Sequence, residues 1–168
     1  LGFVSRALAG KDDSVREFTE PRGFVPVDPS AFHMAHLELP LPAAADQVFE
    51  GRLADGREVN LAWMEYENEI DGLRYYVALV SPIKGPGAAG MNFWLDDQEL
   101  LASEDPPGID ADLAQKARGA GLGLSTGGGA ICVYVSSDGW SGRIPGLDID
   151  RMIEAAPAIF NAADRQAS

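Results

Sequence analysis

Residues 47–83 read QVFEGRLADGREVNLAWMEYENEIDGLRYYVALVSPI, and this stretch decides the fold. Two Asp-Gly pairs, Asp55-Gly56 and Asp71-Gly72, separate runs that are rich in Val, Leu and Tyr. Asp-Gly between two such runs is a strong hairpin signal. The stretch therefore predicts an antiparallel meander of three strands joined by two hairpins, at 47–53, 58–67 and 73–83.

Shorter elements are predicted on both sides of this meander. Short strands are predicted at 23–27 and at 91–95. A further hairpin is predicted from two strands at 121–126 and 130–136. The strand at 23–27 should lie at a sheet edge, because Pro26 cannot donate to a hydrogen-bond ladder. Helices are predicted at 2–19, at 111–117 and at 148–163. The second helix should be capped by Asp110 and terminated by Gly119.

The last predicted helix, 148–163, has one apolar face and should pack on the sheet. Its apolar residues recur at intervals of three and four: Ile149, Met152, Ile153, Ala156, Ile159, Phe160 and Ala163. Asp148 should cap this helix, and Pro157 should kink it or split it in two. Asp164 and Arg165 lie beyond the apolar pattern, so alanine at either position should leave stability almost unchanged.

These elements predict an α+β domain: an antiparallel sheet of five to seven strands with flanking helices. The 168 residues suit a single domain. Within it, 1–21 form an N-terminal helical segment and 22–95 the meander. Residues 96–168 supply a helix, a hairpin and a C-terminal helix.

The chain is acidic, with 26 Asp and Glu against 13 Lys and Arg and a net charge of −13. No basic stripe is visible, so nucleic-acid binding is not expected. The charge favours a basic partner, although a generally acidic proteome would give the same composition. Cys132 is the single cysteine, which excludes an intramolecular disulfide and fits a reducing compartment.

Four carboxylates, Glu65, Glu67, Glu69 and Asp71, surround the turn between the second and third strands of the meander. Glu65 and Glu67 should share one strand face, with Trp63 and Tyr66 close enough to stack on a sugar. Paired carboxylates can hydrolyse a glycoside when one of them keeps its proton in an apolar setting. The simpler interpretation is a solvated hairpin tip, kept acidic against edge-to-edge pairing.

His33 and His36 share one face if 33–36 is helical, and with Glu38 they could bind zinc. The flanking prolines and the lack of a Glu between the histidines speak against a metal site. Cys132 could be a nucleophile, but it lies in a run typical of a strand interior, where cysteine is usually a small buried apolar residue. We therefore predict neither a metal site nor a cofactor, and no catalytic residue.

Residues 119–129 contain six glycines, which match neither the dinucleotide-binding pattern nor a P-loop. A helix end followed by a hairpin turn explains them. Among the three tryptophans, Trp63 and Trp94 lie in predicted strands and are candidate core residues. Trp140 follows Asp138-Gly139 at a turn, and its exposure would mark a binding surface.

Several features between Arg22 and Ala163 form a recognisable order. These are the entry Arg22-Gly-Phe-Val-Pro26, the hairpin Phe49-Glu-Gly-Arg…Gly56-Arg-Glu-Val, a long Tyr/Val strand, and a closing hairpin with a helix. This order resembles a loose group of uncharacterised actinobacterial domains, similar in layout to the mycobacterial trehalose monomycolate transport factor A. The resemblance implies a Mog1/PsbP-like sheet with flanking helices, tethered to a membrane by an N-terminal helix absent from this chain. It carries no catalytic residues.

The sequence as a whole predicts a non-enzymatic binding or adaptor domain, either cytoplasmic or membrane-tethered. Its partner would be a protein or a small apolar ligand, and Trp140, Trp63, Tyr66, Glu65 and Glu67 are the candidate binding residues. Two alternatives stay open: a carboxylate-based hydrolase that uses Glu65 and Glu67, and an acidic chaperone-like module for a basic partner.

Overall fold

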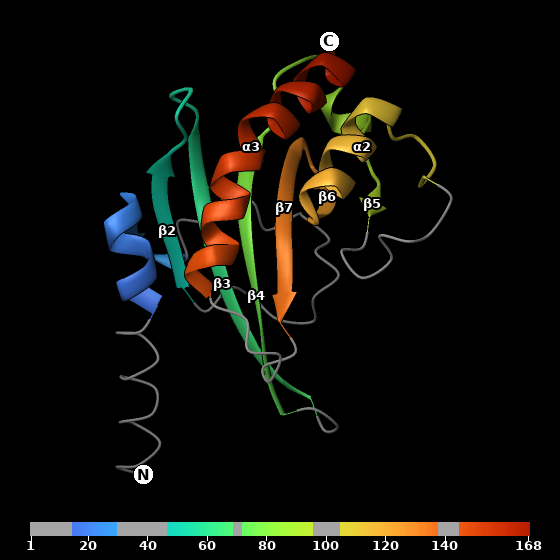
Figure 1. Ribbon diagram of the computed structural model, residues 1–168. Coiled ribbons are helices and arrows are strands. Elements are labelled where there is room, and N and C mark those ends of the chain that lie inside the picture. The colour runs from blue at the N-terminus through green and yellow to red at the C-terminus, as the bar shows by residue number, and fades with distance from the viewer. Residues whose placement is uncertain (1–14, 30–46, 69–71, 96–104, 138–144) are drawn as a thin grey trace, which may run out of the picture.

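Seven strands form one antiparallel sheet in a computed structural model of the chain (Figure 1). They are β1 (Val25–Val27), β2 (Gln47–Arg52), β3 (Glu58–Asn68), β4 (Gly72–Pro82), β5 (Trp94–Leu95), β6 (Gly123–Gly127) and β7 (Ala130–Ser137), in the spatial order β1-β2-β3-β4-β7-β6-β5. The structure describes residues 15–29, 47–68, 72–95, 105–137 and 145–168; of residues 64–68, 72–75, 136, 137 and 145 it describes the backbone alone. The predicted α+β fold is confirmed.

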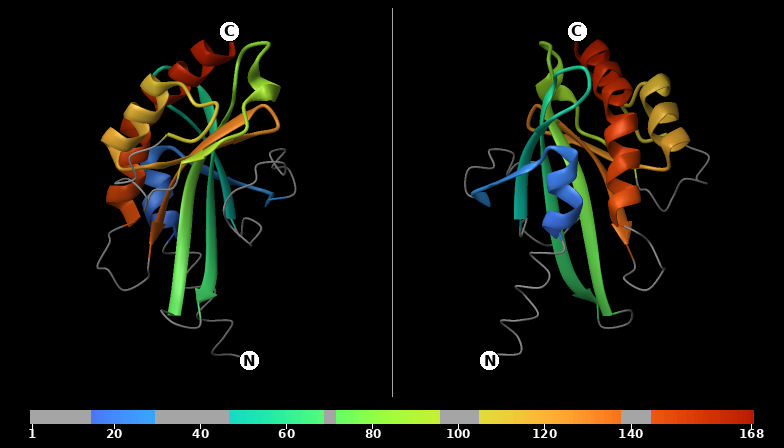
Figure 2. Two further views of the ribbon diagram at one scale, coloured as in Figure 1. Left: turned by 90° about the vertical axis from the view of Figure 1, so that its right-hand side faces the viewer. Right: turned by 60° about the vertical axis from the view of Figure 1, so that its left-hand side comes forward.

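The predicted meander is the centre of this sheet. Strand β3 pairs with β2 from Glu58 to Trp63 and with β4 from Asn60 to Asn68. The turn between β2 and β3 closes through the Leu53 N–H, which donates to the Arg57 carbonyl over 2.9 Å. In Figures 1 and 2, β3 and β4 run on beyond the rest of the sheet.

The glycine-rich stretch is a helix end followed by a hairpin, as predicted. Strands β6 and β7 are joined by Gly128 and Gly129, whose φ angles are 58° and 81°. Two successive positive φ angles define the tight hairpin turn that fits the twist of the flanking strands, and glycine adopts them without strain. The predicted strand at 91–95 is shorter, and β5 lies at the far edge of the sheet beside β6.

The helices lie mainly on one face of the sheet (Figures 1 and 2). Residues 15–19 are helical and lead into the short 3-10 helix η1 (Glu20–Arg22); a second one, η3 (Ala88–Gly90), precedes β5. Helix α2 (Ala111–Ala120) is capped by Asp110 as predicted, because its carboxylate accepts from the Asp112 N–H over 2.9 Å. The predicted terminator was wrong: the C-cap is Gly121, in the left-handed conformation, rather than Gly119.

Helix α3 (Pro145–Ala167) is longer than predicted and is not split at Pro157. It starts at a proline, a residue that suits the first turn because it needs no hydrogen-bond partner there. Asp148 therefore lies in the first turn instead of capping the helix, and its carboxylate pairs with Arg151. Met152 and Phe160, on either side of Pro157, pack into the same core, and this packing offsets the backbone bond that the proline removes.

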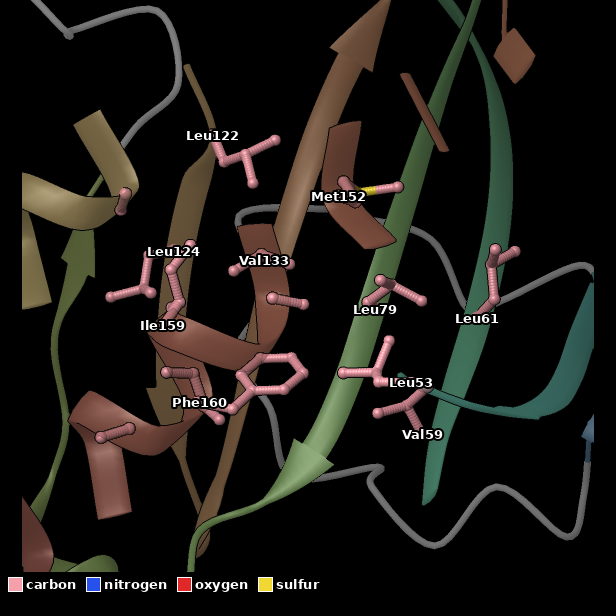
Figure 3. Close-up of a cluster of buried hydrophobic side chains, with 14 of the residues drawn as sticks. Leu53, Val59, Leu61, Leu79, Leu122, Leu124, Val133, Met152, Ile159 and Phe160 are labelled. Atoms are coloured by element: carbon pink, nitrogen blue, oxygen red, sulfur yellow. The ribbon is translucent and has the colours of Figure 1, made fainter. Parts of the chain in front are cut away.

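The core lies between α3, α2 and the sheet (Figure 3). Leu61, Leu79 and Val133 reach it from the sheet, and Ile159 and Phe160 from α3. The opposite face of the sheet is buried as well, at alternate strand positions that lie outside this cluster: Val48, Ala62, Ala78, Val80, Cys132 and Tyr134. Cys132 is thus a buried apolar residue, as predicted, and burial raises the pKa of its thiol to about 12.

A buried ion pair joins α3 to the first hairpin, and the sequence pattern missed it. The Arg57 guanidinium pairs with the Asp164 carboxylate, and their side chains are 6% and 20% exposed. Arg57 also donates to Ser81 Oγ over 2.9 Å and lies 5.6 Å from the centre of the Phe160 ring. The other Asp164 oxygen accepts from the Lys84 N–H over 2.8 Å. Asp164 is therefore partly buried and bonded to two distant segments of the chain, and these contacts argue against the predicted neutrality of Asp164→Ala.

Candidate functional site

Of the five predicted binding residues, the structure describes the side chain of Trp63 alone. Trp63 is buried in the core, so its ring is not available to stack on a ligand. Glu65, Tyr66 and Glu67 lie in β3, opposite Tyr75, Arg74 and Leu73 of β4. Their side chains are outside the described structure, as are Trp140 and the segment with His33, His36 and Glu38.

No group of three or more His, Cys, Asp or Glu side chains in the described residues could hold a metal ion. None of the helices found there is long and apolar enough to span a bilayer.

Trp94 is the exposed aromatic residue that sequence reasoning placed in the core. Its side chain is 48% exposed, whereas the next residue, Leu95, is buried in the core. Neighbouring residues in a strand point to opposite faces of the sheet. Strand β5 has two residues and lies at the sheet edge, so the residue that faces away from the helices keeps much of its surface in solvent. The strand pattern alone could not reveal this, because it gives no information on which strand is an edge.

Tyr134 holds the exposed indole in place. The Trp94 Nε1–H donates to the Tyr134 hydroxyl, and that hydroxyl donates to the Leu95 carbonyl over 3.3 Å. The Tyr134 ring lies against Gly123, opposite it in the sheet; a Cβ at Gly123 would come within 2.3 Å of the ring. Glycine is therefore required for this packing. One edge of the indole is fixed by a hydrogen bond while its surface remains accessible.

A groove of about 500 Å³ lies beside the indole. It is lined by Asn92, Phe93, Trp94, Ser125, Thr126, Gly127 and Gly128. None of these residues carries a charge or titrates near neutral pH, so the groove offers stacking and hydrogen bonds but no general acid or base. We call these seven residues the Trp94 groove.

A larger groove of about 770 Å³ lies at the other edge of the sheet, along β1, β2 and β3. Its two arginines are engaged with acids of the same chain: Arg22 binds Asp150 through two hydrogen bonds of 2.5 and 2.9 Å, and Arg52 pairs with Glu58 over 2.9 Å. The hydrogen bond from Arg22 lowers the pKa of Asp150 below its usual value. Because its cations are engaged and it has no aromatic side chain, this groove is the weaker candidate despite its size.

Comparisons with protein-family models, with curated proteins and with solved structures found no match for this chain. The resemblance to the actinobacterial domains therefore stays a prediction, and the case for function rests on the geometry of the Trp94 groove.

Proposed function

We propose that the chain is a non-enzymatic binding domain and that the Trp94 groove is its binding site. The observation that carries the proposal is an indole that is half exposed yet fixed in orientation by Tyr134. Exposing an aromatic surface of this size to water is unfavourable, and tryptophan is among the residues that contribute most to binding energy at interfaces. A fixed ring also loses little conformational freedom when a partner covers it.

The chemistry of the lining favours binding over catalysis. The groove is lined by the Asn92 amide, by the buried residues Ser125 and Thr126 and by two glycines around the indole, and Thr126 Oγ1 already accepts from the Phe93 N–H. Such groups orient a ligand through hydrogen bonds but do not transfer protons readily at neutral pH. The single thiol close to the groove, Cys132, lies buried beneath the sheet surface, and its raised pKa keeps it protonated.

The test is partner capture with matched variants. The full chain, its Trp94→Ala variant and a Val25→Ala control are immobilised, exposed to extract from the source cells and crosslinked. Val25 is an exposed apolar residue at the opposite edge, so its truncation controls for general loss of surface hydrophobicity. We expect the parent and Val25→Ala to recover the same specific partner and Trp94→Ala to lose it.

A further variant tests the anchoring itself. Tyr134→Phe removes the acceptor for the indole N–H and leaves the rings in place. A hydrogen bond of this kind contributes about 1 kcal/mol, so partner affinity should fall about fivefold. Equal capture by all four proteins would place the binding site elsewhere, and turnover of a small molecule by the pure protein without any specific partner would refute the binding-domain proposal.

A further inference from the structure

We propose that the partner binds as an extended, basic polypeptide segment, which adds a strand to the sheet at β5 and covers the Trp94 indole. This inference rests on the proposed function, because it specifies what occupies the Trp94 groove.

The backbone of Trp94 faces the open edge of the sheet. The Thr126 N–H donates to the Phe93 carbonyl over 3.0 Å, and the Phe93 N–H donates to Thr126 Oγ1 over 3.0 Å. Phe93 thus directs both of its backbone groups toward β6. In an antiparallel pair this makes Trp94 and Ser125 the non-hydrogen-bonded pair, so the N–H and C=O of Trp94 point away from β6.

Nothing in the described part of the chain satisfies these groups. Among the described strands β5 is the last one of the sheet, and the backbone groups of Trp94 and of the preceding Asn92 bond to no described residue. At the opposite edge, β1 contains Pro26, which lacks an N–H and so protects that edge from further pairing. Among the described residues, the edge at β5 therefore offers an unblocked donor and acceptor to an incoming strand.

The indole lies where a side chain of the added strand would meet it. In a sheet, directly opposite residues on neighbouring strands place their side chains about 5 Å apart on the same face. A residue paired with Trp94 would therefore lie on the indole, on the face of the sheet that also carries Tyr134. An apolar side chain at that position would remove the exposed indole surface from water.

The net charge of −13 favours a basic segment. Between Gly85 and Gln115 the sequence contains seven Asp and Glu and neither Lys nor Arg, although four of these acids, between 96 and 104, lie outside the described residues. Asp105 and Asp112 are paired with cations of the helices. From Gly121 to Ser137, which forms β6 and β7, the sequence has no charged residue. A Lys- or Arg-rich segment would thus be attracted to the acidic chain and would meet no cation on β5, β6 or β7.

Four synthetic heptapeptides test the inference. One alternates Lys and Val, and the second replaces each Lys by Glu. The other two are the Lys peptide with N-methyl groups on every second backbone amide, one in each of the two registers. Binding is measured by fluorescence anisotropy and by the NMR shifts of the Trp94 backbone and indole N–H groups. We expect the Lys peptide to shift both signals, and the Glu peptide to bind at least about tenfold more weakly.

N-methylation separates strand addition from simple stacking. Methyl groups on the amides that face β5 remove donors, so affinity should fall about tenfold or more in one register and little in the other. Within the protein, Asn92→Pro removes an outward N–H; it is compared with Asn92→Ala, which loses the same groove side chain but keeps that N–H. Proline restricts the residue before it to an extended conformation, and Met91 already has one, with φ −87° and ψ 106°. The backbone at Met91 is therefore compatible with proline at position 92. Thermal melts of both variants check that the fold is kept.

Each outcome bears on one proposal or on both. Equal affinity in both N-methyl registers, or equal binding of the Glu peptide, refutes the added basic strand. If no peptide binds while partner capture still requires Trp94, the inference fails and the proposed binding site stands. If partner capture does not depend on Trp94, both the proposed binding site and the added basic strand are refuted.

Discussion

Phe160 and Trp94 are large aromatic residues that the fold treats in opposite ways. Phe160, in α3, is fully buried beneath Arg57, and the surrounding side chains close the space around it (Figure 3). Trp94, in the edge strand β5, keeps 48% of its surface exposed, and Tyr134 fixes only its Nε1 edge.

The difference separates the stability of the domain from its proposed function. A ring with every side covered contributes its full apolar surface to folding. A ring that is fixed but half exposed contributes less to folding and keeps surface that a partner can bury. Substitutions at the helix-covered side should therefore change stability strongly, and those at the Trp94 edge should change binding more than stability.

The largest effect is expected for Phe160→Ala. Removing a buried ring deletes its apolar contacts and leaves a cavity between α3 and β4, so the free energy of unfolding should fall by about 3–5 kcal/mol. Urea titration followed by circular dichroism measures this change. A variant as stable as the parent would mean that α3 does not pack on the sheet as described.

Asp164→Ala should give the second largest effect. It leaves the Arg57 guanidinium buried without its carboxylate and removes the acceptor of the Lys84 N–H. Breaking a buried pair typically destabilises by roughly 3–5 kcal/mol, and we expect about 2–3 kcal/mol because Arg57 keeps Ser81 as an acceptor. Arg165→Ala is the matched control: Arg165 is 64% exposed, and its loss should change stability by less than about 0.5 kcal/mol. Equal melting curves for the two variants would contradict the role of the ion pair.

Trp94→Ala should destabilise only modestly. The indole is half exposed, and the Tyr134 hydroxyl still donates to the Leu95 carbonyl after the substitution. Full burial of a large side chain contributes about 1.5–3 kcal/mol, so a loss of about 1 kcal/mol is expected. In a domain of this size that corresponds to roughly 2–4 °C in Tm, measured by calorimetry. A loss as large as that of Phe160→Ala would show that Trp94 contributes to folding like a core residue, and it would contradict the proposed difference between Trp94 and Phe160.

The sequence predicted the elements that depend on local signals. The hairpin at Asp55-Gly56, the hairpin turn after Gly127 and the Asp110 cap follow from residues a few positions apart, and the structure confirms them. The apolar spacing of 149–163 likewise identified the buried face of α3.

What the sequence could not predict depends on contacts between distant segments. Arg57 and Asp164 are 107 residues apart, and no local pattern distinguishes Asp164 from its exposed neighbour Arg165. The exposure of Trp94 follows from the position of β5 at the sheet edge, which is decided by the pairing of 94–95 with 124–125. The packing of Tyr134 on Gly123, which positions the tyrosine that holds Trp94, could not be predicted either. It can be recognised only once the register of β6 and β7 is known.

The smallest effect is expected at the other end of α3, where the Arg22–Asp150 pair can be tested by pH. The hydrogen bonds and charge of Arg22 lower the pKa of Asp150 in the folded state. A carboxylate with a depressed folded-state pKa adds stability above its unfolded value near 3.9, and this stability is lost as the pH falls through the folded-state value. Asp150 is 53% exposed, so the contribution should be at most about 1 kcal/mol and should shrink in high salt. Urea titrations of the parent and of Asp150→Asn should therefore differ slightly at pH 7 and converge as the pH falls below about 4. A difference that is unchanged down to pH 2 would show that the asparagine acts through something other than the lost charge.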